Sequence, residues 1–238
     1  MIKAILFDLD GTLLPMDQDI FLKAYFGGLV KAMVPHGYVP DLVVKSIWAG
    51  TGAMVKNDGI RTNEEVFWES FCGFFGADAR KDEPIFQQFY ETDFQKVSAV
   101  CGHDPRAAEA IREIKALGYR TILATNPLFP PIATQSRVRW AGLKPEDFEL
   151  ITTYDNSSFC KPNLRYYEEI LSKQGLSPAE CVMVGNDVGE DMIAQKLGMK
   201  VFLLTDCIIN KAGTDIDQFP HGSFPELMAY IDRAAGEE

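Results

Sequence analysis

Two acidic residues follow an apolar run near the start of the chain. Residues 3–7 have the composition of a buried strand, and Asp8 and Asp10 come directly after it. Because residues i and i+2 of an extended segment point to the same side, their carboxylates can converge if the strand persists to that point. Two neighbouring buried carboxylates are costly unless a cation compensates their charge. The pair therefore predicts a cation site at this point.

Two further acidic residues, Asp187 and Asp191, follow another apolar run over residues 181–184. If both runs are strands of one parallel sheet, their carboxyl ends meet at the same edge of the sheet. Three or four carboxylates gathered there favour a hard, oxygen-seeking cation, and Mg²⁺ fits best. The sequence therefore predicts a magnesium site at this edge.

Phosphoryl transfer is the chemistry that suits such a site. A carboxylate can attack phosphorus and form an aspartyl-phosphate, and a second acid can protonate the departing alcohol. The Thr125 hydroxyl and the backbone N–H of Asn126 could hold phosphate oxygens, and Lys161 supplies a compact positive charge. Taken singly, each of these motifs is also typical of an ordinary turn or helix start. To explain all of them in that way, in this order, would require four separate coincidences.

The apolar runs alternate with helical patterns along most of the chain. This alternation predicts an α/β fold with a doubly wound parallel sheet that helices cover on both faces. The expected strands lie over residues 3–7, 120–124, 150–153, 181–184 and 201–204.

Residues 16–95 interrupt the alternation with long helical stretches that are rich in aromatic residues. We interpret them as a small inserted α-helical domain, which leaves residues 1–15 plus 96–238 as a discontinuous core. Aromatic residues such as Phe67, Trp68 and Phe71 are expected to pack among the helices and against the core, and an aromatic substrate pocket is the alternative.

Composition narrows the classes of partner. The 238-residue chain has a net charge of −11, which argues against broad contact with nucleic acids or anionic membranes. Its five scattered cysteines form no CxxC pair, so we expect a reduced, cytoplasmic setting. We expect neither a signal peptide nor a membrane span, because no apolar run is long enough.

The order of the motifs resembles the haloacid dehalogenase superfamily, in the phosphatase branch that is similar to phosphoglycolate phosphatases and β-phosphoglucomutase. The motifs are, in chain order, Asp8-Leu-Asp10-Gly-Thr, Thr125-Asn126, Lys161-Pro162 and Gly185-Asn-Asp187-Val-Gly-Glu-Asp191. The helical insertion resembles the C1-type cap that such proteins carry between their first two motifs. The resemblance implies a Rossmann-like core with a cap over its active site.

The resemblance also implies roles for the acidic residues. Asp8 would be the nucleophile and a Mg²⁺ ligand. Asp10 would be the general acid and base, and it would give the metal its backbone carbonyl. Asp187 would be a metal ligand, and Asp191 and Asn186 would support the metal site.

The implied phosphate-binding residues are Thr125, Asn126 and Lys161, and Lys161 would also stabilise the nucleophile. One residue departs from what a phosphate loop needs. Pro127 follows the Thr-Asn pair and has no N–H, so the loop loses one possible phosphate donor.

The implied reaction is hydrolysis of a small phosphomonoester. The motifs are shared with phosphomutases that act on sugar phosphates, so a mutase is the first alternative. A haloacid dehalogenase would have no use for Asp10 as a leaving-group acid, and a phosphonate hydrolase would be expected to lack it. A non-catalytic phosphate-binding regulatory protein on the same fold is the alternative from another class.

The cap is expected to select the substrate. Residues 45–59 form a plausible loop over the site, in which Lys56 could bind a second anionic group, although a simple turn with a solvated lysine explains the same residues. A cap over the site leaves little room for a macromolecule, so the expected partner is a small phosphorylated metabolite. The oligomeric state does not follow from the sequence.

Overall fold

The computed structural model describes residues 1–236 of the chain and contains one parallel sheet. The strand order is β3-β2-β1-β4-β5-β6, so the chain winds outward in both directions from β1. The predicted doubly wound α/β fold is therefore confirmed. The strands are β1 (Ala4–Phe7), β2 (Arg120–Leu123), β3 (Leu150–Ile151), β4 (Cys181–Gly185), β5 (Lys200–Leu204) and β6 (His221–Gly222).

All five expected strands are present, and β6 is an addition that the sequence did not reveal. β6 has only two residues, and neither is apolar, so it leaves no hydrophobic signal. It forms because Leu203 and Leu204 of β5 pair with it in parallel at the edge of the sheet.

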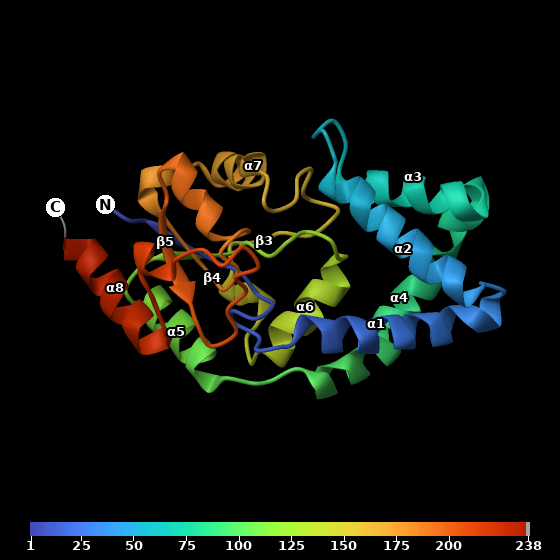
Figure 1. Ribbon diagram of the computed structural model, residues 1–238, viewed down its shortest axis with the longest axis horizontal. Coiled ribbons are helices and arrows are strands. Elements are labelled where there is room, and N and C mark those ends of the chain that lie inside the picture. Colours follow the sequence, from blue (N-terminus) through green and yellow to red (C-terminus); the bar gives the residue numbers. More distant parts are fainter. Residues whose placement is uncertain (237–238) are drawn as a thin grey trace.

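Helices cover both faces of the sheet (Figure 1). Alternate residues of each strand point to opposite faces. Phe7 packs in the hydrophobic cluster that includes α5 and α8, and Leu6 packs in the cluster that includes α7. The core helices and 3₁₀ turns are α5 (Pro105–Ala116), α6 (Pro131–Trp140), η4 (Pro145–Asp147), α7 (Leu164–Gln174), η5 (Pro178–Glu180), η6 (Met192–Leu197), η7 (Ile216–Gln218) and α8 (Phe224–Gly236).

The segment of residues 18–100, between β1 and α5, is largely helical, and we call it the cap segment. It lies at the end of the molecule away from the N-terminus, and α6 lies between it and the rest of the core (Figure 1). The predicted boundaries of a separate inserted domain, residues 16–95, stay a prediction. The helices of this segment run from Gln18 to Val100. They are α1 (Gln18–Met33), η1 (Val34–His36), α2 (Pro40–Val55), α3 (Asn63–Phe75), η2 (Ala77–Asp82), α4 (Glu83–Glu91) and η3 (Asp93–Val100).

Aromatic rings hold the cap segment together. Trp68 meets Phe71 and Phe86 in edge-to-face contacts with ring centroids 5.5 Å and 5.6 Å apart. Such contacts add stability beyond the apolar area that the rings bury. Packing is therefore the role of many of these aromatic residues, as the sequence predicted.

None of the five cysteines is paired in the structure. Within residues 1–236, no helix is both long enough and apolar enough to cross a membrane.

The first turn of α3 fastens the cap segment to the core. The buried Asn63 amide lies 3.4 Å from the carbonyl oxygens of Pro127 and Phe159, and the Asn63 backbone N–H donates to Ser157 O at 2.8 Å. The Asn57 amide donates to Asn63 Oδ1 at 3.0 Å. One side chain therefore connects the cap segment with two loops of the core.

We expect Asn63→Ala to lower the free energy of unfolding by about 1–3 kcal/mol, because it leaves buried groups without their partner. Urea denaturation followed by circular dichroism measures this loss. Gln88→Ala, at an exposed position of α4, is the control and should change the value by less than about 0.5 kcal/mol. Equal effects of the two changes would contradict this role of Asn63.

Candidate active site

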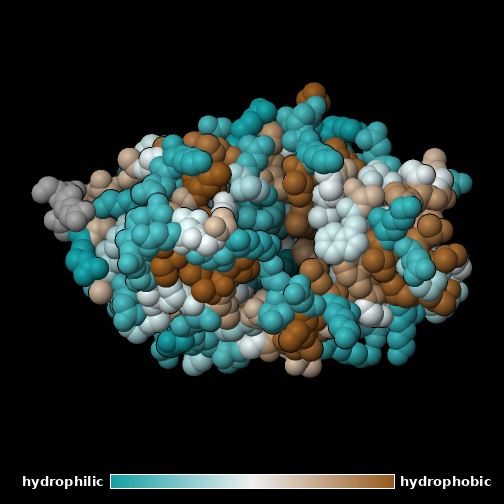
Figure 2. Space-filling view, viewed as in Figure 1, coloured by the Kyte–Doolittle hydropathy of each residue, from teal (hydrophilic) through white to brown (hydrophobic). Residues whose placement is uncertain are grey.

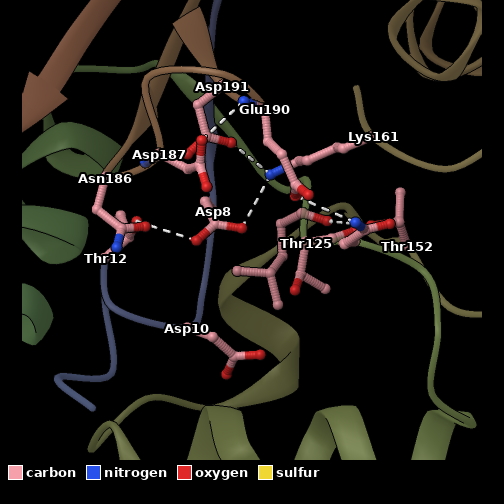
Figure 3. Close-up of polar contacts among 12 residues, drawn as sticks. Asp8, Asp10, Thr12, Thr125, Thr152, Lys161, Asn186, Asp187, Glu190 and Asp191 are labelled. Carbon is pink, nitrogen blue, oxygen red and sulfur yellow. Dashed lines mark hydrogen bonds and ion pairs between the residues drawn. The ribbon is translucent and has the colours of Figure 1, made fainter. Parts of the chain in front are cut away.

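The motif residues meet at the carboxyl edge of the sheet (Figure 3). Asp8 follows β1, Thr125 follows β2, and Asp187 follows β4. Lys161 arrives from the loop between β3 and α7. These residues are up to 179 positions apart in the sequence but lie within one cluster, because parallel strands deliver their carboxyl ends to the same edge.

Lys161 is the centre of this cluster. Its Nζ donates to Asp8 Oδ1 at 2.9 Å and to Asp191 Oδ1 at 2.6 Å, and its side chain is only 1% exposed. Burial acts to lower the pKa of Lys161, but the Asp191 and Asp8 carboxylates outweigh it and hold that pKa well above its usual range. Lys161 therefore stays protonated and fixes the position of Asp8.

The loop after β4 is built around its own carboxylates. Asp187 Oδ1 accepts from the backbone N–H groups of Gly189 and Glu190 at 2.7 Å and 2.9 Å, and Asp191 Oδ2 accepts from the Asp187 N–H at 3.0 Å. These bonds hold residues 187–191 in a turn, and the short η6 follows it. The Asp187 carboxylate points toward Asp8 (Figure 3).

Thr12 holds the second oxygen of Asp8. Its hydroxyl lies 3.0 Å from Asp8 Oδ2 and 3.1 Å from Asn186 Oδ1, and its single proton can serve one of these acceptors at a time. The Asn186 amide donates to Cys207 O at 2.6 Å, which orients its oxygen toward Thr12. Asn186 thus supports Asp8 through Thr12.

A turn at Gly11 makes this contact possible. Gly11 has a φ of +85°, and a Cβ atom there would lie 2.2 Å from Asn186 Nδ2. Any other residue would displace Asn186 and strain the backbone.

The Asp10 side chain does not converge with Asp8, contrary to the expectation from an extended strand. β1 ends at Phe7, and the turn that follows directs the Asp10 carboxylate away from the other acids (Figure 3). There its Oδ2 forms an ion pair with Arg137 Nη1, and its Oδ1 is buried without a hydrogen-bond partner among the described residues. Whether the Asp10 carbonyl binds a metal stays a prediction.

Arg137 is buried in α6, with 1% of its side chain exposed. Its guanidinium stacks on the Phe129 ring, 4.4 Å from the ring centroid, and Nη2 lies 3.3 Å from the Thr134 hydroxyl. Burial raises the pKa of Asp10, and the Arg137 charge offsets only part of this rise. The environment therefore favours a protonated Asp10 more than free solvent does.

Hydrogen bonds from neighbouring side chains fix the backbone of the predicted phosphate loop. The carbonyl oxygen of Thr125 accepts from the hydroxyls of Thr152 at 2.7 Å and Tyr166 at 2.8 Å. The Asn126 amide donates to Glu190 Oε2 at 3.1 Å, while Asn126 Oδ1 has no hydrogen-bond partner in the described chain. These contacts fix the loop and leave its buried Thr125 side chain beside Asp8 and Lys161 (Figure 3).

The donor set is compatible with Mg²⁺. Asp8 and Asp187 present oxygen atoms, which this ion prefers, and their carboxylates lie close together (Figure 3). Among residues 1–236, no three His, Cys, Asp or Glu side chains are grouped so that they alone could hold a metal ion. A magnesium site here would therefore need a backbone oxygen or water in addition to these two carboxylates.

Lys56 does not reach this cluster. It lies exposed at the end of α2, and it lines a surface depression together with Arg61 and Glu69. The structure therefore brings together the core residues predicted from the sequence and leaves Lys56 apart from them.

Three residues of the site are not among those predicted from the sequence. Thr12 belongs to the first motif, and its position four residues after Asp8 was the available signal. Glu190 lies inside the motif after β4, and burial raises its pKa. Arg137 had no signal, because Arg139 stands two positions away on the same helix and is exposed.

Comparison with known proteins agrees with this arrangement. The family model for haloacid dehalogenase-like hydrolases matches residues 2–198. A glyceraldehyde 3-phosphate phosphatase from Methanothermobacter thermautotrophicus is 25% identical over 208 residues, which cover 86% of each chain.

Solved structures share the fold at low sequence identity. A 2-haloacid dehalogenase from Pseudomonas syringae pv. tomato superimposes with a TM-score of 0.62 at 20% identity, over 98% of this chain and 99% of that one. The magnesium-bound putative hydrolase YfnB from Bacillus subtilis gives a TM-score of 0.54 at 17% identity, over 97% and 99%. Neighbours of different activity share this fold, so the reaction must be argued from the site.

We expect Arg137→Met to lower the free energy of unfolding by about 2–3 kcal/mol, because it leaves the Asp10 carboxylate without its cation. The loss is below that of a fully buried pair, since the Asp10 side chain is 21% exposed. Adding Asp10→Asn to Arg137→Met should recover part of the loss in urea denaturation. If the second change lowers stability further, the ion pair is not the cause.

Proposed function

The chain belongs to the haloacid dehalogenase-like hydrolase family, and we propose that it is a Mg²⁺-dependent phosphatase that hydrolyses a small phosphomonoester through an aspartyl-phosphate. The observation that carries this proposal is the separation of the two aspartates of the first motif. Asp8 is paired with the protonated Lys161, whereas Asp10 lies apart in an environment that raises its pKa. One carboxylate is thus suited to attack and the other to donate a proton.

In the first half of the reaction, a carboxylate oxygen of Asp8 attacks phosphorus and the ester P–O bond breaks. The departing alkoxide takes the carboxylic-acid proton of Asp10, which becomes a carboxylate. Lys161 and Thr12 contact the two Asp8 oxygens and keep the nucleophile oriented. The products of this step are the free alcohol and an acyl phosphate on Asp8.

In the second half, the Asp10 carboxylate accepts a proton from water while the water oxygen attacks phosphorus. The bond between phosphorus and the Asp8 oxygen then breaks, and inorganic phosphate and both aspartates are regenerated. Arg137 stabilises the ionised form of Asp10 that exists between the two steps, because its guanidinium contacts the Asp10 carboxylate.

Asp8 and Asp187, with the carbonyl oxygen of Asp10, are the residues that would hold Mg²⁺. When bound, the ion would neutralise charge between the attacking carboxylate and the phosphate oxygens. Thr125 and Lys161 would bind the same phosphate from the protein side. The magnesium-bound neighbour YfnB supports this assignment by analogy of fold.

A phosphatase fits better than the alternatives. A halide leaves without a proton, so a dehalogenase has no need of a group such as Asp10. A mutase must hold a second phosphate group while the sugar phosphate reorients, but every Lys and Arg between residues 18 and 95 is exposed. The phosphatase name of the archaeal relative points in the same direction.

We expect Asp10→Asn to lower kcat about 10²–10⁴-fold for alkyl phosphates, because the alcohol then leaves without a proton. The loss in the first half-reaction should be smaller for p-nitrophenyl phosphate, whose leaving group needs no acid. Burst kinetics with both esters separate the two half-reactions. An equal loss for both esters in the burst phase would contradict the acid role of Asp10.

Removal of divalent metal with EDTA should abolish phosphate release, and Mg²⁺ should restore it. Ca²⁺ should restore little activity, because it prefers more ligands and longer distances than Mg²⁺. Release of phosphate is measured with a colorimetric assay, with EDTA that has been saturated with Mg²⁺ as the control. Full activity after exhaustive dialysis against EDTA would refute the metal requirement.

A further inference from the structure

We propose that the substrate carries an uncharged, apolar leaving group that binds in an aromatic cavity between the cap segment and the core. This inference rests on the phosphatase function proposed above and names the class of its substrate. Figure 2 shows the hollow between the two parts, with hydrophobic residues on its wall.

The cavity has the walls of an apolar ligand site and room for a small group. Its free volume is about 100 Å³, and it lies between α1, α2, α3 and α4 of the cap segment and the loop that follows β2. An engineered apolar cavity of about 150 Å³ binds benzene, so a space of this order suits a small apolar group. In this protein, the lining of the cavity includes the rings of Tyr25, Trp48, Phe67, Phe129 and Tyr154.

Two side chains, Phe129 and Arg137, link the cavity to Asp10. Phe129 carries Arg137 at 4.4 Å from its ring centroid, and Arg137 in turn binds Asp10. The same Phe129 ring lines the cavity and meets the Tyr25 ring edge-to-face at 5.4 Å. The cavity is therefore the nearby apolar space into which we infer that the alcohol protonated by Asp10 extends.

Part of the cavity wall comes from the residues that follow the predicted phosphate loop. Leu128, Phe129 and Pro130 line the cavity and follow Thr125 and Asn126 within five residues of chain. The loop that is proposed to bind the phosphate therefore continues directly into the wall of the cavity.

The polar groups of the cavity are neutral. The hydroxyls of Tyr25 and Tyr90 lie 3.0 Å apart and bond to each other, and the Thr51 hydroxyl donates to Ile47 O at 2.9 Å. Burial raises the pKa of Tyr25 to about 12, and the Tyr90 bond and the Arg137 charge offset only part of this rise. These phenols are therefore not anions at neutral pH.

No basic side chain of the cap segment is placed to bind a second anion. Every Lys and Arg between residues 18 and 95 is exposed. Three of them are paired on the surface: Arg61 with Glu69, Arg80 with Glu64 and Lys81 with Asp78. In the wall beside Phe129, burial and then the Glu64 charge raise the pKa of Tyr154, so this phenol is neutral as well. A carboxylate or second phosphate in this cavity would lose its hydration, and the buried cation beside the cavity, Arg137, is already paired with Asp10.

The test compares three esters whose leaving groups are all aliphatic alcohols: 2-phenylethyl phosphate, ethyl phosphate and phosphoglycolate. We expect kcat/KM for 2-phenylethyl phosphate to exceed that for ethyl phosphate by at least about 30-fold, because the ring is removed from water. Phosphoglycolate should be the poorest of the three.

Thr51→Lys places a cation in the wall of the cavity. It should lower kcat/KM for 2-phenylethyl phosphate by at least about tenfold and raise the value for phosphoglycolate. Ile60→Lys, at a position that is 85% exposed and outside the cavity lining, is the matched control and should change neither value. Thermal melting checks that both variants fold. If Thr51→Lys does not fold, the comparison of the three esters with the unaltered enzyme tests the proposal by itself.

The outcomes separate the two proposals. No phosphate release from any ester with Mg²⁺ present would overturn the phosphatase proposal and this one with it. Release that is fastest with phosphoglycolate, or equal for the ethyl and 2-phenylethyl esters, would overturn the apolar cavity alone and leave the phosphatase intact.

Discussion

A single buried ammonium group determines the arrangement of the whole site. Lys161 lies between Asp8 and Asp191, and neither carboxylate could be buried beside the other without it. The lysine comes from the loop after β3, and its partners come from β1 and β4, so the ion pairs depend on the strand order of the sheet. The same contacts that stabilise the closely packed edge of the sheet also orient the proposed nucleophile.

A second ion pair serves the other side of the reaction. Arg137 forms an ion pair with Asp10, and its guanidinium stacks on the Phe129 ring. Phe129 follows the phosphate-binding residues in the same loop and also lines the aromatic cavity. The acid, its buried partner and the chamber for the leaving group therefore form one connected set of contacts. The cap segment adds aromatic walls and no buried cation, which is why we infer an apolar leaving group.

Much of this was predictable because strand ends carry a strong signal. The apolar run before Asp8 and the acids after residue 184 predicted both the parallel sheet and the cluster. The direction of Asp10 was not predictable, because it depends on where β1 ends and not on the alternation of side chains. Arg137 was not predictable for a related reason. Arg137 and Arg139 both lie in α6, and only the packing of this helix decides which of the two is buried. Lys56 lies on the surface at the end of helix α2, apart from the cluster, so its proposed contact with a second anionic group stays a prediction.

The central claim is that Asp8 becomes phosphorylated during turnover. Acid quenching of the enzyme during hydrolysis of p-nitrophenyl phosphate, followed by borohydride reduction and peptide mass spectrometry, tests it directly. We predict homoserine at position 8, formed by reduction of the acyl phosphate, and no such product in Asp8→Asn. Steady turnover without a reduced residue at position 8, or with the modification on another side chain, would contradict the account.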